Sequence, residues 1–148
     1  MYKHILIATD GSELAAKGVD QGLALAVPLH ASVTVLTVTR PLPPQVARAA
    51  VAGGVHDPVI RYDEQIDEHM RMHFTPVKQR ASQHGITVEL VHEIDDSPAG
   101  AIVRTARLRN CDLIVMSSHG RRGVDRLILG SQTAEVLAHT ILPVLVVR

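Results

Sequence analysis

Short apolar runs alternate along the chain with longer segments whose apolar residues recur at helical spacing. Apolar runs rich in β-branched residues are typical of strands. They predict strands over His4–Ala8, Ser32–Thr39, Ile86–His92, Asp112–Met116 and Leu142–Val147. Helical spacing predicts helices over Glu13–Leu29, Val59–His84, Pro98–Asn110 and Ser131–His139, with Ser131 as the cap of the last helix.

The predicted strands and helices alternate, and the first, fourth and fifth strands are apolar throughout. This pattern predicts an α/β fold in which helices cover both faces of a parallel sheet. A proline- and glycine-rich stretch, Arg40–Pro58, interrupts the alternation, and we expect a long surface loop there with a short helix over Gln45–Val51. Ligands of such sheets bind beyond the carboxyl ends of the strands, where the strand order reverses. The loops after the first and fourth strands therefore form the candidate site.

Composition excludes several classes of protein. A formal net charge of zero and a pI of about 7.1 argue against a nucleic-acid or membrane-surface binder. Aromatic residues are 2% of the chain, too few to provide stacking platforms for single strands. Cys111 is the single cysteine, and its place before an apolar strand predicts a packed thiol. Because no signal-peptide pattern and no apolar run of spanning length is evident, we expect a cytoplasmic protein without membrane insertion.

The stretch Met116–Thr133, MSSHGRRGVDRLILGSQT, combines glycines, hydroxyl groups and arginines. A helix N-terminus carries unpaired amides and a partial positive charge, which favour a phosphate group. Gly130 lacks a Cβ that would hinder a phosphate, and Ser131 and Thr133 add hydroxyl donors. The arginines that add positive potential are Arg121, Arg122 and Arg126. A plainer interpretation is that Gly130-Ser131 only caps a helix and that the arginines are solvated; the residues alone leave both open.

Other candidate residues also have two interpretations. Asp10 could bind ribose hydroxyls or a metal on phosphates, or could cap the first helix through an Asx turn. His119 could contact a phosphate or ribose, or could turn outward. His69 and His73 are one helical turn apart, as zinc ligands can be, but no third ligand is evident, so no metal ligand is assigned. No nucleophile and base form a recognisable set, so no catalytic residue is assigned either.

Four segments together resemble the universal stress protein family: ILIATDGS (Ile5–Ser12), DLIVMSSHGRRG (Asp112–Gly123), LILGSQTAEVLAHT (Leu127–Thr140) and PVLVV (Pro143–Val147). They occur in the family's order and span the whole chain. The resemblance implies one universal stress protein domain over residues 1–148. It implies a five-stranded parallel sheet of order 3-2-1-4-5, the adenine nucleotide alpha hydrolase-like fold. It also implies a homodimer joined through the last strand, Leu142–Val147.

One branch of the family binds ATP through glycine, two residues, glycine, nine residues, then Gly-Ser or Gly-Thr. The second half of this pattern is complete, because Gly120 is followed by nine residues and then by Gly130-Ser131. The first glycine is replaced by Ser117, which adds a Cβ and a hydroxyl group where ribose and phosphates approach. The resemblance therefore favours the ATP-binding branch with one departure from its pattern.

Carried over by position, the family's site assigns parts of an ATP molecule to particular residues. Ala8, Asp10 and Val38 would lie near the adenine and ribose, and Met116 and Ser117 would line the ribose. The residues expected to cradle the phosphates, with a magnesium or manganese ion, are Gly120, Gly130, Ser131, Gln132 and Thr133.

The function implied is a stress-response regulatory module that binds ATP and hydrolyses it slowly if at all. The alternatives are a dimeric interaction protein of the same family without nucleotide, and an ATP-hydrolysing or adenylate-forming enzyme. The last lacks support, since no SGGxDS-like loop follows the first strand.

Overall fold

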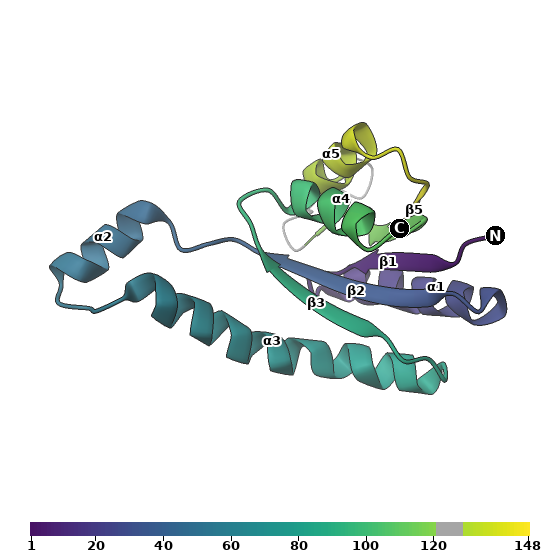
Figure 1. The fold of residues 1–148 in the computed structure, drawn as a ribbon, viewed down its shortest axis with the longest axis horizontal. Helices are drawn as coiled ribbons and strands as arrows, with labels where there is room; N and C mark the ends of the chain where they lie inside the picture. Colours follow the sequence, from purple (N-terminus) through teal and green to yellow (C-terminus); the bar gives the residue numbers. More distant parts are fainter. Residues whose placement is uncertain (121–128) are drawn as a thin grey trace.

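A computed structural model describes residues 1–120 and 129–148 of the chain. It contains a five-stranded parallel sheet of order β3-β2-β1-β4-β5 (Figure 1). The strands are β1 (His4–Ala8), β2 (Ser32–Thr39), β3 (Glu89–Ile94), β4 (Leu113–Ser117) and β5 (Val144–Val147). The helices are α1 (Glu13–Leu29), α2 (Pro44–Ala52), α3 (Pro58–Gln83), α4 (Pro98–Leu108) and α5 (Ser131–His139). The predicted fold class and strand order are confirmed.

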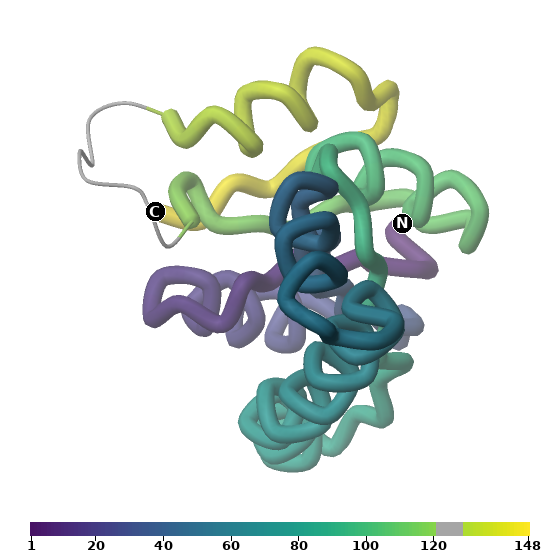
Figure 2. The backbone as a smooth tube through the Cα atoms, turned by 90° about the vertical axis from the view of Figure 1, so that its left-hand side faces the viewer, coloured from purple at the N-terminus to yellow at the C-terminus, as the bar shows by residue number. Residues whose placement is uncertain are grey.

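Helices cover both faces of this sheet (Figures 1 and 2). Side chains alternate between the faces of a strand, so β1 contributes to two separate cores. Ile5 and Ile7 pack with α1 and α3, whereas Leu6 packs with α4 and with Val136 of α5. All three β1 residues are fully buried, as expected for the central strand of a parallel sheet. The carboxyl ends of β1 and β4 therefore lie side by side between the two helical layers.

Local signals account for most element boundaries. Ser12 caps α1 by accepting a hydrogen bond from the Ala15 amide at 3.1 Å. His30 ends α1 in the left-handed conformation, with φ of 51°. Ser97 caps α4 in the same way as Ser12 caps α1, through the Gly100 amide at 3.1 Å. The α3 helix runs without interruption through Pro76, although proline has no amide to donate within the helix.

The third strand begins three residues later than predicted and ends two residues later. Ile86 and Val88 pack against the α1–α3 core, but pairing with β2 begins only at Glu89. The alternation of apolar residues over residues 86–92 therefore indicates which side chains are buried, and not where the strand begins to pair. Pairing continues to Ile94 because β2 extends to Thr39, which is the partner of Ile94.

An arm formed by α2 and the first turns of α3, residues 44–65, projects beyond the sheet (Figure 1). No residue of this arm is buried. The buried residues of α3 come later, from Met70 to Ala81. The short helix predicted over Gln45–Val51 is confirmed as α2, although it is one residue longer at each end.

The expectation for Cys111 is confirmed, because its side chain is buried beside the α4 core. Burial, followed by the charge of Asp112, raises the pKa of the thiol to about 11. The thiol is therefore protonated at neutral pH. No helix within residues 1–120 or 129–148 is both long and apolar enough to cross a membrane.

Two glycines of α1 give a matched test of its packing on the sheet. A Cβ at Gly22 would lie 2.5 Å from Cδ1 of the fully buried Ile7, so Gly22→Ala forces the core apart. A Cβ at Gly18 would meet the Met116–Ser117 backbone at an ordinary 3.6 Å or more. We expect Gly22→Ala to lower the free energy of unfolding in urea by about 1–2 kcal/mol. Gly18→Ala should raise it by about 0.5–1 kcal/mol through helix propensity. Equal effects would contradict this packing.

Candidate functional site

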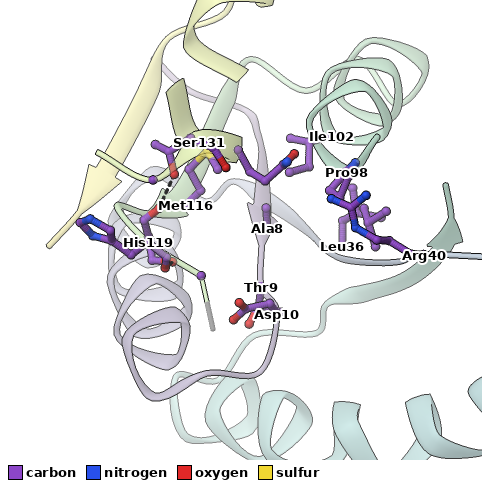
Figure 3. Close-up of a pocket in the computed structure, with 16 residues that line it drawn as sticks. Ala8, Thr9, Asp10, Leu36, Arg40, Pro98, Ile102, Met116, His119 and Ser131 are labelled. Carbon is purple, nitrogen blue, oxygen red and sulfur yellow. Dashed lines mark hydrogen bonds between the residues drawn. The ribbon is translucent and has the colours of Figure 1, made fainter. Parts of the chain in front are cut away.

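A pocket of about 440 Å³ opens at the carboxyl ends of β1, β2 and β4 (Figure 3). It lies where the strand order reverses, between β1 and β4. Every residue that the sequence assigned to the candidate site lines it: Ala8, Asp10, Val38, Met116, Ser117, His119, Gly120, Gly130, Ser131, Gln132 and Thr133. The sheet thus brings together residues from four separate segments of the chain.

Asp10 holds the loop after β1 in place. Its Oδ1 accepts a hydrogen bond from the Ser12 amide at 2.9 Å, which is the Asx turn considered from the sequence. A Cβ at Gly120 would lie 2.8 Å from the other carboxylate oxygen, Oδ2. Gly120 is therefore required for the close approach of the β4 loop to Asp10. Asp10 can form the Asx turn and contact the β4 loop at the same time, because Oδ1 accepts from the Ser12 amide while Oδ2 faces Gly120.

The start of α5 is packed directly onto the end of β4. The Gly130 amide donates to the Ser118 carbonyl at 2.8 Å, and the Thr133 hydroxyl donates to the Ser117 carbonyl at 2.9 Å. A Cβ at Gly130 would lie 2.8 Å from that Ser118 carbonyl oxygen. Glycine is thus demanded here by the protein's own backbone, before any ligand is considered. Its φ of −60° is open to other residues, so the reason is space and not conformation.

The predicted helix cap at Ser131 is wrong by one residue. Gly130 is the N-cap of α5, and Ser131 is the first helical residue. Because glycine has no side chain, the N-cap residue itself makes no side-chain hydrogen bond to the first turn of α5. Ser131 is exposed at the same end. The first turn of α5 therefore presents its amides and a hydroxyl group toward the pocket, with the positive end of the helix dipole behind them.

Ser117 fits its position without strain. Its hydroxyl donates to the His119 carbonyl at 2.7 Å, and the residue is buried. Its φ is not positive, so the backbone here does not require glycine. The serine hydroxyl thus supports the turn that follows β4. His119 does not turn outward, because it is 7% exposed and its Nδ1 lies 2.9 Å from the Ser118 hydroxyl.

The N-terminus of α4 forms the opposite wall of the pocket. Gln132 of α5 reaches across to it, and its Oε1 accepts a hydrogen bond from the Ala99 amide at 3.0 Å. Asp95 fixes the preceding turn by accepting from the Ser97 amide at 2.8 Å. This hydrogen bond, and then the guanidinium of Arg104, lower the pKa of the Asp95 carboxyl. The Gln132 side chain therefore joins the two helices that flank the pocket.

The pocket also contains residues that sequence reasoning missed: Thr9, Leu36, Arg40, Pro98 and Ile102. Leu36 and Arg40 could have been predicted from the sequence, because each lies two residues from Val38, which was assigned to the site at the end of β2. Pro98 and Ile102 reach the pocket because α4 packs on β2, which no local pattern indicates.

The three arginines and the pair of histidines one turn apart that the sequence singled out do not add described residues to this site. Arg121, Arg122 and Arg126 lie outside the described residues. Among residues that are described, no group of three or more histidine, cysteine, aspartate or glutamate side chains is placed to hold a metal ion. His73 instead lies with its Nε2 3.1 Å from the Thr37 hydroxyl, under the sheet.

The sequence of this chain is similar to known proteins along its whole length. The model of the universal stress protein family matches residues 1–148. The chain belongs to the universal stress protein family. The universal stress protein YxiE of Bacillus subtilis (strain 168) is 29% identical over the full length of both chains. The universal stress protein MJ0531 of Methanocaldococcus jannaschii is 30% identical, over 100% of this chain and 83% of its own.

Solved structures of universal stress proteins share the fold. The structure of hypothetical protein MJ0577 has a TM-score of 0.82 and 26% identity, covering 99% of this chain and 96% of that one. A universal stress protein in complex with cAMP has a TM-score of 0.69 and 22% identity, covering 99% and 97%. The Archaeoglobus fulgidus protein in complex with dAMP has a TM-score of 0.64 and 17% identity, covering 99% and 98%.

The geometry at Ser117 predicts that restoring glycine weakens the fold. Ser117→Gly removes the hydrogen bond to the His119 carbonyl and adds backbone freedom to the unfolded chain. We expect the free energy of unfolding to fall by about 1–2 kcal/mol in urea titrations. Ser117→Ala, the control, removes the hydroxyl alone and should cost about 1 kcal/mol. A glycine variant more stable than the natural protein would show that the serine is strained.

Proposed function

We propose that this universal stress protein binds an adenine nucleotide, ATP in the first instance, in the pocket at the carboxyl ends of β1, β2 and β4. The observation that carries the proposal is the division of the pocket into two ends. Leu36, Val38 and Ile102 make one end apolar, which suits a base, while the start of α5, whose N-cap is a glycine without a side chain, suits a phosphate group at the other end. Two structures of the same fold are complexes with cAMP and dAMP, which supports the adenine nucleotide.

We further propose that the nucleotide acts as a regulatory ligand of a cytoplasmic stress-response module and is hydrolysed slowly if at all. Two buried hydroxyl groups at the phosphate end, those of Ser117 and Thr133, support this, since they serve the protein's own loop. Ser117 donates to the His119 carbonyl and Thr133 donates to the Ser117 carbonyl. A hydroxyl group committed in this way is a poor nucleophile.

Asp10 is the residue that fits a magnesium or manganese ion. It supplies the carboxylate of the described pocket lining, and Mg²⁺ is commonly bound by one or two carboxylates together with phosphate oxygens. In that arrangement the ion would neutralise phosphate charge, while the Ser12 amide continues to orient the carboxylate through Oδ1.

Ser131 offers a test that spares the fold. Ser131→Asp places a carboxylate on the first, exposed residue of α5, where it favours the helix but repels phosphate. Calorimetric titration of nucleotide-free protein with ATP and Mg²⁺ should give micromolar affinity, reduced at least about tenfold in Ser131→Asp. Ser131→Asn, of matched shape and without charge, should bind within about threefold of the natural protein. If the natural protein binds no adenine nucleotide, the proposal is wrong, and a nucleotide-free interaction protein becomes the better description.

We also propose a homodimer joined through the last strand, Leu142–Val147. The segment Leu142–Val147 contains β5, which pairs with β4 on one side and forms the edge of the sheet on the other. Leu145 of β5 is 38% exposed. An apolar edge strand of this kind is an open template for pairing.

Charge on the β5 edge tests the dimer. We expect sedimentation velocity to show a dimer that Leu145→Lys converts to a monomer, because the new charge would be buried in the paired edge. The control, Leu108→Lys, changes an exposed leucine at the end of α4 and should leave the dimer intact. A natural protein that sediments as a monomer at every concentration would exclude this interface.

A further inference from the structure

Among the described residues, no phenylalanine, tyrosine or tryptophan lines the apolar end of the pocket. Its lining is aliphatic, from Leu36 and Val38 of β2, Ile102 of α4, and Pro98 at the start of α4. Nucleotide bases are commonly held by stacking on a flat side chain, which contributes about 1–3 kcal/mol per base. A purine at this end would have aliphatic groups on one face. A planar group at the rim would be suited to cover its other face.

Arg40 is a planar side chain at that rim (Figure 3). It follows the last residue of β2, and its guanidinium lies beside Pro98 and across the pocket from Ser131. The guanidinium carries a full charge but makes no salt bridge with a carboxylate in the described part of the chain. Its position is therefore not explained by an ion pair.

Two hydrogen bonds fix Arg40 in place. Its Nη1 donates to the Asp96 carbonyl, ahead of α4, at 3.0 Å. Its own carbonyl accepts from the Tyr62 hydroxyl of α3 at 3.1 Å. An exposed arginine ordinarily loses side-chain entropy when a ligand orders it, and here part of that ordering exists in advance. Arg40 is exposed and lines the pocket, so a ligand there can reach its guanidinium.

We propose that Arg40 is a base-contacting residue that stacks its guanidinium on the exposed face of the purine and closes the apolar end of the pocket. This inference rests on the proposed nucleotide site. Guanidinium is planar and weakly hydrated, so it stacks on aromatic faces, and the cation adds attraction to the ring. An ammonium group has the same charge but no plane, so lysine cannot replace arginine in this role.

A phosphate series separates base stacking from phosphate attraction. We would titrate adenosine, AMP, ADP and ATP into the natural protein, Arg40→Ala and Arg40→Lys. Stacking predicts that both substitutions weaken all four ligands by a similar factor, about tenfold. The loss should also be nearly independent of salt, because it does not depend on ligand charge. Arg48→Ala, an exposed arginine on α2 outside this pocket, is the control and should bind normally.

The other outcomes are decisive as well. A loss that grows from adenosine to ATP, fades in salt and is restored by lysine would overturn the inference and make Arg40 a counter-charge for phosphates. Unchanged affinities in Arg40→Ala would show that this arginine does not touch the ligand, with the proposed function intact. A natural protein that binds none of the four ligands overturns the proposed function and this inference together. Because Tyr62 bonds the backbone of residue 40, both substitutions keep the bond to α3.

Discussion

The complete burial of β1 is the constraint from which the architecture follows. Ile5, Leu6 and Ile7 are inaccessible to solvent, so both faces of the strand must be covered by helices. The chain has three aromatic residues, and the two cores are consequently built mainly from aliphatic side chains, with Phe74 as a buried aromatic residue. Helices cover both faces of β1, and the parallel strands β2 and β4 flank it. A ligand can therefore approach β1 only at the ends of the strand. The residues that follow Ala8 are placed at the carboxyl end, beside the residues that follow Ser117.

Sequence reasoning succeeded where the physical signal is local. The bounds of β1, α1 and β2 follow from continuous apolar runs, β-branched content and the Ser12 cap, and all three were predicted residue for residue. The bounds of β3 were wrong because an apolar alternation records which side chains are buried, whereas the strand begins where its partner can pair. Ser131 was misplaced as a cap because a glycine N-cap leaves no side-chain signal.

The residues assigned to the candidate site share one pocket, but the sequence did not predict the contacts they make there. The family resemblance brought the assigned residues to one pocket, yet it did not reveal what Gln132 or Ser117 bonds, since those partners are set by packing between helices and turns. Arg40 escaped notice for the same reason. Its acceptor, the Asp96 carbonyl, is 56 residues away along the chain. Glycine positions show the limit most clearly, because the Cβ clash at Gly130 is with the protein's own Ser118 carbonyl. The geometry of the loop is thus built before a ligand arrives.

The arm has a consequence for local stability. Residues 44–65 bury no side chain, so little apolar surface opposes their unfolding, and α2 is too short to persist alone. Amide hydrogens of the arm should therefore exchange with solvent through openings that leave the sheet intact. Tyr62, near the base of the arm, bonds the carbonyl of the residue whose guanidinium stands at the pocket rim. This hydrogen bond links the solvent-exposed arm to the mouth of the pocket, so fraying of the arm would release a restraint on Arg40.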